Sequence, residues 1–316
     1  MKIIVTGAAG FIGFHLCKSL LNDNYEVLGI DNINDYYDIK LKTSRLEILN
    51  SFNNFNFKKI NIADRDGVTK VFKEFQPEKV VNLAAQAGVR YSIENPFAYL
   101  DSNIDGFLNI IENCRHSKVD GLIYASSSSV YGGNKKIPFS ITDKVNNPIS
   151  LYGATKLSNE LISNSYSYLY GLHTTGLRYF TVYGPWGRPD MAIYIFTKKI
   201  IAGEPIPVFN HGKMKRDFTF IDDIVSGTRA AIDKNYKCEV FNLGNSSSQK
   251  LLDVINLIEK ELNTKAIIDF KPMQPGDAEE SFADIEYSKE KLSFLPETSI
   301  DIGITKFIDW YKKYNK

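Results

Sequence analysis

Ile3-Ile4-Val5 runs directly into Thr6-Gly7-Ala8-Ala9-Gly10-Phe11-Ile12-Gly13, and this stretch decides the fold. The apolar residues predict a strand, the three glycines a tight turn, and the residues after them a helix. Gly7 lets the chain turn sharply, Gly10 lets the backbone approach a pyrophosphate, and Gly13 removes a side chain where helix and strand pack. The helix N-terminus adds N–H donors and a positive dipole for phosphates. We therefore predict a dinucleotide-binding βαβ unit here rather than a flexible surface turn.

An acidic residue follows the second strand of this unit. The strand is predicted at Tyr25–Ile30, and Asp31 comes next, 18 positions after Gly13. A carboxylate at this position accepts hydrogen bonds from both ribose hydroxyls and would repel a 2′-phosphate. We therefore predict that the dinucleotide is NAD rather than NADP.

Composition excludes several classes of protein. The 316 residues include 38 Lys and Arg against 37 Asp and Glu, a net charge of +1, and no segment concentrates the positive charge. We expect no nucleic-acid partner, because such binding needs a clustered basic surface. Cys17, Cys114 and Cys238 lie far apart, which predicts reduced core cysteines and no metal site. A strand that begins at residue 3 and the lack of a long apolar run predict a cytoplasmic protein without a signal peptide or membrane segment.

Strands and helices alternate along the first half of the chain. We expect strands at Phe55–Ile60, Lys79–Leu83 and Gly121–Ala125, a helix at Asp66–Phe75, and an amphipathic stretch from Asn95 to Cys114. This alternation predicts an α/β fold, a Rossmann-type doubly wound parallel sheet with helices on both faces. After about residue 174 prolines become frequent and the elements short. We therefore predict an NAD-binding domain at 1–176, to which the chain returns around 219–243, and a smaller C-terminal substrate-binding lobe at 177–316.

Hydroxyl, phenol and ammonium groups are the candidates for catalysis. Ser126-Ser127-Ser128-Ser129 follows the strand at Gly121–Ala125, and Tyr152 and Lys156 lie four apart at the start of a predicted helix, on one face. The charges of Lys156 and of NAD⁺ would lower the pKa of Tyr152 and make its phenolate a usable base. The Tyr-x-x-x-Lys spacing alone is weak, since it also occurs at four other places without this context: Tyr36/Lys40, Tyr131/Lys135, Tyr194/Lys198 and Tyr287/Lys291.

The glycine loop and the Ser, Tyr-x-x-x-Lys set together resemble the extended short-chain dehydrogenase/reductase family, which includes nucleotide-sugar epimerases and dehydratases. The resemblance covers essentially the whole chain and implies a catalytic triad of Ser127, Tyr152 and Lys156. It also implies cofactor contacts beyond the three glycines and Asp31. Asn61 stands where the family usually has Asp, and its amide oxygen can still accept from the adenine amino group. The implied cofactor contacts are Phe11, Ile12, Asn32, Asn61, Ile62, Leu83, Ala84, Ala85, Tyr152, Lys156 and Tyr179.

The residues beside the triad favour epimerisation over elimination. Dehydratases of the family carry Asp-Glu next to the catalytic hydroxyl, and decarboxylases carry Glu before Val-Tyr-Gly, whereas this chain has Ser128-Ser129. The stretch from Arg178 to Ala192 is similar to that of the UDP-glucuronate 4-epimerases. In that subfamily the counterpart of Arg188 binds the sugar carboxylate, aided here by Ser128 and Thr181. The resemblance implies further UDP-sugar contacts at Gln86, Arg90, Arg216 and Asp277.

Alternatives remain open at this point. A 4-epimerase of neutral UDP-hexoses or UDP-N-acetylhexosamines would not need Arg188, which would then pair with Asp190 at a loop surface. A UDP-glucuronate decarboxylase would release CO₂, and a non-enzymatic dinucleotide sensor would more often lack Tyr152 or Lys156. The resemblance also implies a homodimer through helices at about Pro96–Cys114 and Tyr152–Leu169. The tyrosines Tyr166, Tyr168 and Tyr170 would be partly buried there, or would belong to the ordinary core.

Overall fold

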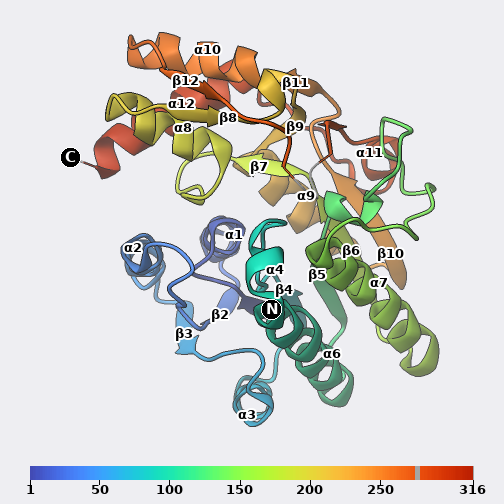
Figure 1. The fold of residues 1–316 in the computed structure, drawn as a ribbon. Helices are drawn as coiled ribbons and strands as arrows, with labels where there is room; N and C mark the ends of the chain where they lie inside the picture. The colour runs from blue at the N-terminus through green and yellow to red at the C-terminus, as the bar shows by residue number, and fades with distance from the viewer. Residues whose placement is uncertain (275–277, 316) are drawn as a thin grey trace.

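The structure, a computed structural model, describes residues 1–274 and 278–315 (Figure 1). Seven parallel strands form the main sheet in the order β10-β6-β5-β4-β1-β2-β3. The strand order reverses beside β1, since β2 lies on one side of it and β4 on the other. Such a switch point opens a crevice at the carboxyl ends of the strands. The strands are β1 (Lys2–Thr6), β2 (Glu26–Asp31), β3 (Phe55–Lys59), β4 (Lys79–Asn82), β5 (Gly121–Ser127), β6 (Thr174–Tyr179) and β10 (Cys238–Leu243).

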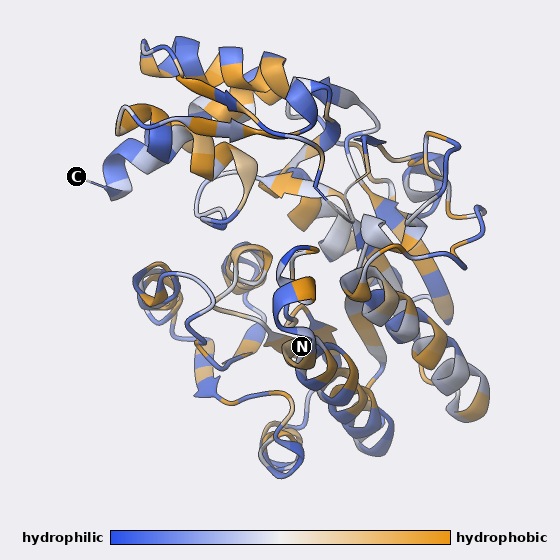
Figure 2. Cartoon of the chain, in the orientation of Figure 1, coloured by the Kyte–Doolittle hydropathy of each residue, from blue (hydrophilic) through white to orange (hydrophobic). Residues whose placement is uncertain are grey.

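Helices cover both faces of this sheet because its strands are apolar on both sides. In β1, Ile3 and Val5 belong to one hydrophobic cluster and Ile4 to the other. The first cluster includes side chains of α1 (Phe11–Asn22), α2 (Ile39–Leu49) and α9 (Ile221–Lys234). The second includes side chains of α3 (Arg65–Phe75), α6 (Gly106–Ser117) and α7 (Leu151–Tyr170). Figure 2 shows hydrophobic and hydrophilic residues alternating along such helices, as expected when one face packs on a sheet. The predicted doubly wound parallel sheet is confirmed.

The stretch predicted as one amphipathic segment after Asn95 is helical but changes its winding. It consists of α5 (Pro96–Tyr99), the wider π-type turn η1 (Leu100–Asp105) and α6. A short helix, α4 (Tyr91–Glu94), precedes it. Asn103 within η1 is buried and donates to the carbonyl oxygen of Gln86 at 3.0 Å, so the altered turn contacts the segment after β4.

The remaining elements lie over the carboxyl ends of the main strands (Figure 1). A second sheet joins β11, β9 and β13, with β7 also paired to β9, and β12 pairs with β8. The predicted boundary after residue 176 falls inside β6, and the division into two domains stays a prediction. These elements are β7 (Thr181–Tyr183), β8 (Ile206–Val208), β9 (Lys215–Phe220), β11 (Ser248–Lys250), β12 (Ile268–Phe270), β13 (Glu280–Ser281), α8 (Ala192–Ile201), η3 (Phe209–Gly212), α10 (Leu251–Leu262), α11 (Glu286–Leu292) and α12 (Ile300–Tyr314).

Two expectations about side chains need correction. Cys17 and Cys114 are buried as predicted, but Cys238 is exposed, because it begins the edge strand β10. Tyr168 and Tyr170 are not ordinary core residues, since 87% and 48% of their surfaces are exposed on α7. Within the described ranges, no helix is long and apolar enough to cross a membrane. No group of three His, Cys, Asp or Glu residues there could hold a metal ion.

Candidate active site

A cavity of about 880 Å³ lies where the two groups of elements meet. Its walls come from the ends of β1 to β6 on one side and from β7, β9 and β13 on the other. Every residue predicted to bind cofactor or substrate or to act in catalysis lines this cavity, except Asp277, which lies outside the described residues. The structure thus brings the predicted set together, while the role of each residue stays a prediction.

The glycine loop has the shape that a dinucleotide needs. Gly7 has φ +71°, and a Cβ on it would lie 2.8 Å from the backbone nitrogen of Ala84, so only glycine fits. At Gly13 a Cβ would lie 2.0 Å from the carbonyl oxygen of Gly7. The helix therefore packs closely on the loop itself, and not on the strand as predicted. No side chain caps α1 at Gly10, which leaves first-turn N–H groups available to a phosphate.

Asp31 is held at the end of β2 by the backbone. Its Oδ2 accepts from the N–H of Ala9 at 3.1 Å and its Oδ1 from the N–H of Ile33 at 2.8 Å. Each carboxylate oxygen has two lone pairs, so both keep acceptor capacity on the cavity side. This geometry fits the vicinal hydroxyls of a ribose.

Ser127 and Tyr152 meet through a hydrogen bond between their hydroxyl groups. Ser127 is the last residue of β5, and Tyr152 lies in the first turn of α7, which Ser150 caps by accepting from the N–H of Gly153 at 3.1 Å. Burial raises the pKa of Tyr152, while the Ser127 hydrogen bond and the charge of Arg188 act in the opposite direction. The net direction in the protein without its cofactor is upward, and the lowering expected from Lys156 together with NAD⁺ stays a prediction.

Lys156 is buried one helical turn after Tyr152. Its Nζ donates to the carbonyl oxygen of Ala125 at 2.9 Å, and burial lowers its pKa to about 8. Among the described residues, the cation that acts on the pKa of Tyr152 is Arg188 rather than Lys156. The tuning of Tyr152 by Lys156 together with NAD⁺ stays a prediction, and the ammonium group of Lys156 is attached to β5.

A buried ion pair supports α7 behind these groups. Glu160 accepts from Arg178 in β6 at 2.9 Å and 2.7 Å, and from the hydroxyl of Ser126 at 2.5 Å. Both members of the pair are nearly inaccessible, with 8% and 4% exposure. Ser126 and Arg178 each precede a cavity residue, Ser127 and Tyr179. The pair therefore joins α7 to the ends of the two strands that carry these cavity residues.

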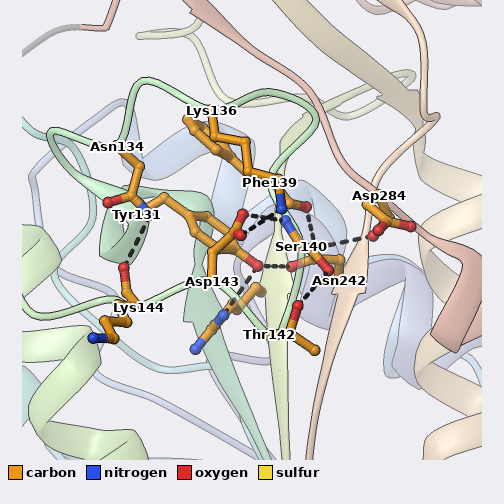
Figure 3. Close-up of polar contacts among 11 residues, drawn as sticks. Tyr131, Asn134, Lys136, Phe139, Ser140, Thr142, Asp143, Lys144, Asn242 and Asp284 are labelled. Atoms are coloured by element: carbon orange, nitrogen blue, oxygen red, sulfur yellow. Dashed lines mark hydrogen bonds and ion pairs between the residues drawn. The ribbon is translucent and has the colours of Figure 1, made fainter.

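The turn after Ser127 is fixed to the rest of the molecule by Tyr131 (Figure 3). Its hydroxyl donates to Asn242 Oδ1 at 2.6 Å and accepts from Arg178 at 3.0 Å. The amide of Asn242 donates in turn to the carbonyl oxygens of Phe139 and Asp284, at 2.8 Å and 3.0 Å. The end of β10 thus holds three separate segments beside the cavity.

Arg188 forms a bidentate ion pair with Asp190 inside the cavity wall. The nitrogen–oxygen distances are 3.0 Å and 2.5 Å, and 21% and 31% of the two side-chain surfaces are exposed. The pairing considered in the alternative interpretation is therefore present. It lies at the cavity, however, where Ser128 and Thr181 are also found.

The two other arginines predicted to contact the substrate also line the cavity. The guanidinium of Arg90 lies 4.8 Å from the centre of the Phe209 ring. Arg216 donates to the backbone carbonyl oxygens of Lys215 and Glu279, at 2.8 Å and 3.1 Å. Gln86 is buried beside them in the segment that follows β4.

Sequence reasoning missed several residues around the site. Tyr36, Lys42 and Phe209 line the cavity without having been assigned a role, and Asp190 was considered only as a partner of Arg188 at a loop surface. Arg45 is fully buried and donates to the carbonyl oxygens of Ala9 and Trp186, at 2.8 Å and 2.6 Å, and to the hydroxyl of Tyr37 at 2.7 Å. The available signal was the spacing of Lys42 and Arg45, which places two cations on one face of α2.

Several known nucleotide-sugar 4-epimerases are similar to this chain over nearly all of its length. UDP-glucuronate 4-epimerase 4 of Arabidopsis thaliana is 44% identical to the chain, over 99% of this chain and 76% of that protein. The crystal structure of UDP-glucuronic acid 4-epimerase from Bacillus cereus, in complex with UDP-glucuronic acid and NAD, is 38% identical with a TM-score of 0.94, covering 99% of this chain and 100% of that chain. UDP-glucose 4-epimerase from Thermotoga maritima, solved with UDP-glucose, is 31% identical with a TM-score of 0.93 and full coverage of both chains, 100% and 100%.

A family model matches most of the chain. It describes the NAD dependent epimerase/dehydratase family and aligns with residues 3–244. This range contains the glycine loop, Asp31, and the Ser127, Tyr152 and Lys156 set. The chain belongs to the NAD dependent epimerase/dehydratase family.

Proposed function

We propose that the protein is an NAD-dependent 4-epimerase that converts UDP-glucuronate to UDP-galacturonate with retention of the carboxylate. One observation carries this proposal. Arg188 shares a cavity with the hydrogen-bonded pair of Ser127 and Tyr152, and its charge acts on the pKa of Tyr152. A cation close to the proton-transfer groups suits a sugar that bears its charge two carbons from the reacting centre.

The residues of the cavity fit NAD. The loop at Gly7 and Gly13 has no room for Cβ atoms, and Asp31 offers acceptors for ribose hydroxyls. Asn61 and Ile62, just after β3, are the proposed contacts of the adenine ring. Leu83, Ala84 and Ala85, just after β4, are proposed to lie along the cofactor. When bound, NAD supplies the nicotinamide that takes hydride from C4 and returns it.

The groups that transfer the proton are Tyr152, at the start of α7, and Ser127, at the end of β5. Tyr152, as phenolate, removes the proton from O4 of the sugar while C4 is oxidised to a ketone. Ser127 donates a hydrogen bond to the phenolate, which favours its charged form, and contacts O4 of the substrate. Lys156, on α7 with its ammonium group bonded to the carbonyl oxygen of Ala125 in β5, would hold the cofactor ribose. The 4-keto sugar presents its opposite face before reduction, and the configuration at C4 is thereby inverted.

Retention of the carboxylate requires control of its orientation. Oxidation at C4 gives a β-keto acid, which loses CO₂ when the carboxylate stands perpendicular to the ketone. A guanidinium can hold a carboxylate through two parallel hydrogen bonds and fix its plane. Arg188 would supply this grip, with hydroxyl groups from Ser128 and Thr181 at the same cavity wall.

The nucleotide must stay bound while the sugar turns over, so binding energy belongs to the diphosphate and the base. Arg216 is the proposed diphosphate contact, and Arg90 and Gln86 are further proposed contacts. Asp277, proposed for the nucleotide ribose, lies outside the described residues.

We also propose that two copies of the chain pair through α5, α6 and α7. Large apolar side chains are exposed on α5 and α7, including Phe97 at 72%, Leu161 at 61% and Tyr168 at 87%. Large apolar side chains exposed on neighbouring helices are typical of an interface. The two-domain division and a cytoplasmic location stay predictions from the sequence.

Proton NMR of the anomeric region tests the proposed reaction directly. Purified protein is incubated with UDP-glucuronate without added NAD, and the expected product is UDP-galacturonate with no UDP-pentose. A UDP-pentose product would indicate decarboxylation instead. Conversion of UDP-glucose or UDP-N-acetylglucosamine without any conversion of UDP-glucuronate would favour the neutral-sugar alternative.

An arginine variant tests the assignment of Arg188. Arg188→Ala is expected to raise KM for UDP-glucuronate about 10–100-fold, since a hydrogen-bonded charge pair contributes about 1.5–3 kcal/mol. Arg65→Ala, at the exposed start of α3, is the matched control. An unchanged KM in Arg188→Ala would remove the carboxylate assignment.

A further inference from the structure

Asp190 presents to Arg188 the same chemical group as the proposed substrate. Its Oδ1 accepts from Nε of Arg188 at 3.0 Å, and its Oδ2 accepts from a terminal nitrogen of Arg188 at 2.5 Å. Both oxygens of the carboxylate are therefore hydrogen-bonded to Arg188. This is the bidentate arrangement that an arginine offers to any carboxylate. In the protein, therefore, the Nε edge of the Arg188 guanidinium, one of the two edges that can grip a carboxylate through two hydrogen bonds, is already occupied.

A hydrogen bond from a tyrosine also fixes Asp190. The hydroxyl of Tyr36, in the segment between β2 and α2, donates to Oδ2 of Asp190 at 3.2 Å. The Tyr36 ring lies 4.9 Å from that of Tyr91, and all four side chains line the cavity. Burial works to raise the pKa of Asp190, but the charge and hydrogen bonds of Arg188 outweigh it and lower the pKa overall. Asp190 is therefore anionic at neutral pH.

We infer that Asp190 is a specificity-determining residue, an internal carboxylate that the carboxylate of the substrate displaces from Arg188. The inference rests on the proposed function and adds the residue that sets the choice between charged and neutral sugars.

The exchange favours an anionic sugar for a simple reason. A substrate carboxylate replaces one bidentate ion pair by another, and Asp190, partly exposed, turns to solvent and gives up its hydrogen bond from Tyr36. A neutral C6 hydroxyl offers no charge, so it cannot repay the loss of the Arg188–Asp190 pair. Discrimination by a competing group of this kind selects against the wrong ligand rather than for the right one.

The sign of a change in KM tests the inference. Asp190→Asn keeps the size of the side chain and removes its charge. It is expected to lower KM for UDP-glucuronate about fivefold to tenfold with little change in kcat, because the competing charge is gone. It is also expected to raise kcat/KM for UDP-glucose, since no ion pair must then be broken. Tyr36→Phe, which loses one contact to Asp190 and keeps the ion pair, should change KM in the same direction by a smaller factor.

Opposite or null results overturn the inference. A higher KM for UDP-glucuronate in Asp190→Asn would mean that Asp190 orients Arg188 for the substrate. An unchanged KM would mean that the pair does not compete at all. Asp253→Asn, exposed in the first turn of α10, is the control for a general change of charge. If the unmodified protein itself yields no UDP-galacturonate, the proposed function fails first, and the inference falls with it.

Discussion

Lys156 Nζ donates a 2.9 Å hydrogen bond to the carbonyl oxygen of Ala125, two residues before Ser127. This bond attaches α7 to β5 close to the point where the Ser127 and Tyr152 hydroxyls meet. This contact between a helix and a strand therefore helps to set the relative position of the two proton-transfer groups. The Glu160–Arg178 pair reinforces it one turn further along α7.

Removal of the Tyr152 hydroxyl should abolish turnover and spare binding. Tyr152→Phe is expected to lower kcat at least about 10²–10⁴-fold, the range for loss of a general base. The measurement is the NMR assay of UDP-galacturonate, with NAD binding followed separately by titration. Tyr25→Phe, which lies outside the cavity lining and outside the proposed dimer helices, is the matched control and should be fully active. Turnover by Tyr152→Phe comparable to the control would exclude Tyr152 as the base.

The pH dependence should report the Ser127–Tyr152 hydrogen bond. Because the base acts as phenolate, kcat/KM rises with pH up to the pKa of Tyr152. The Ser127 hydrogen bond lowers that pKa, so Ser127→Ala should move the rising limb to higher pH. A hydrogen bond to a charged group contributes about 1.5–3 kcal/mol, equal to a displacement of about one to two pH units.

The check is a pH–rate profile of Ser127→Ala beside that of Ser165→Ala. The hydroxyl of Ser165 bonds only within α7, to the carbonyl oxygen of Leu161, among the described contacts. The Ser165 variant should keep the normal profile. A rising limb of Ser127→Ala that stays in place, or moves to lower pH, would contradict the assigned role of the hydrogen bond.

Asp31 should control the choice between NAD and NADP. Asp31→Asn is expected to raise the dissociation constant of NAD about 10–100-fold, since charge-assisted hydrogen bonds to the ribose are weakened. Affinity for NADP should not fall in parallel, because the repelling charge is removed. Titrations of both nucleotides decide the point, with Asp35→Asn, exposed in the same loop, as the control. An equal loss for both would show that Asp31 acts only by holding Ala9 and Ile33.

Breaking the buried pair behind α7 should cost far more stability than breaking a surface pair. Glu160→Gln leaves the Arg178 guanidinium buried without its counter-charge, an expected loss of about 3–5 kcal/mol in the free energy of unfolding. Glu74→Gln, in the exposed pair with Lys70, should cost less than about 1 kcal/mol. Urea unfolding of both variants compares them. Similar losses in the two would contradict a structural role for the buried pair.

Local patterns made much of this site predictable. The glycine loop, Asp31 and the Tyr152/Lys156 spacing are each confined to one short segment, and the chemistry of each segment can be inferred from its residue types and their spacing. The strand ends follow from the alternation of elements, and parallel strands gather their carboxyl ends at one edge. For these reasons the predicted residues, apart from the undescribed Asp277, lie around one cavity.

Contacts between distant segments were not predictable. The bond between Tyr36 and Asp190 joins residues 154 positions apart, and that between Arg45 and Trp186 joins residues 141 apart. No periodicity or motif records such pairs, because they arise only when the second group of elements is placed over the sheet. The burial that raises the pKa of Tyr152 in the protein without its cofactor was not predictable for the same reason, since burial depends on what surrounds the phenol in three dimensions.

The contacts of Arg45 also bear on when, during synthesis of the chain, the glycine turn becomes enclosed. Its guanidinium is fully buried, and one of its partners is the carbonyl oxygen of Trp186, while β10, at residues 238–243, completes the sheet beside β6. During synthesis the glycine turn therefore emerges long before the segments that enclose it. A nascent chain that stops before Trp186 holds a charged group that has not found its final partners. The enclosure of the glycine turn by these contacts is therefore completed only after the later half of the polypeptide has been made.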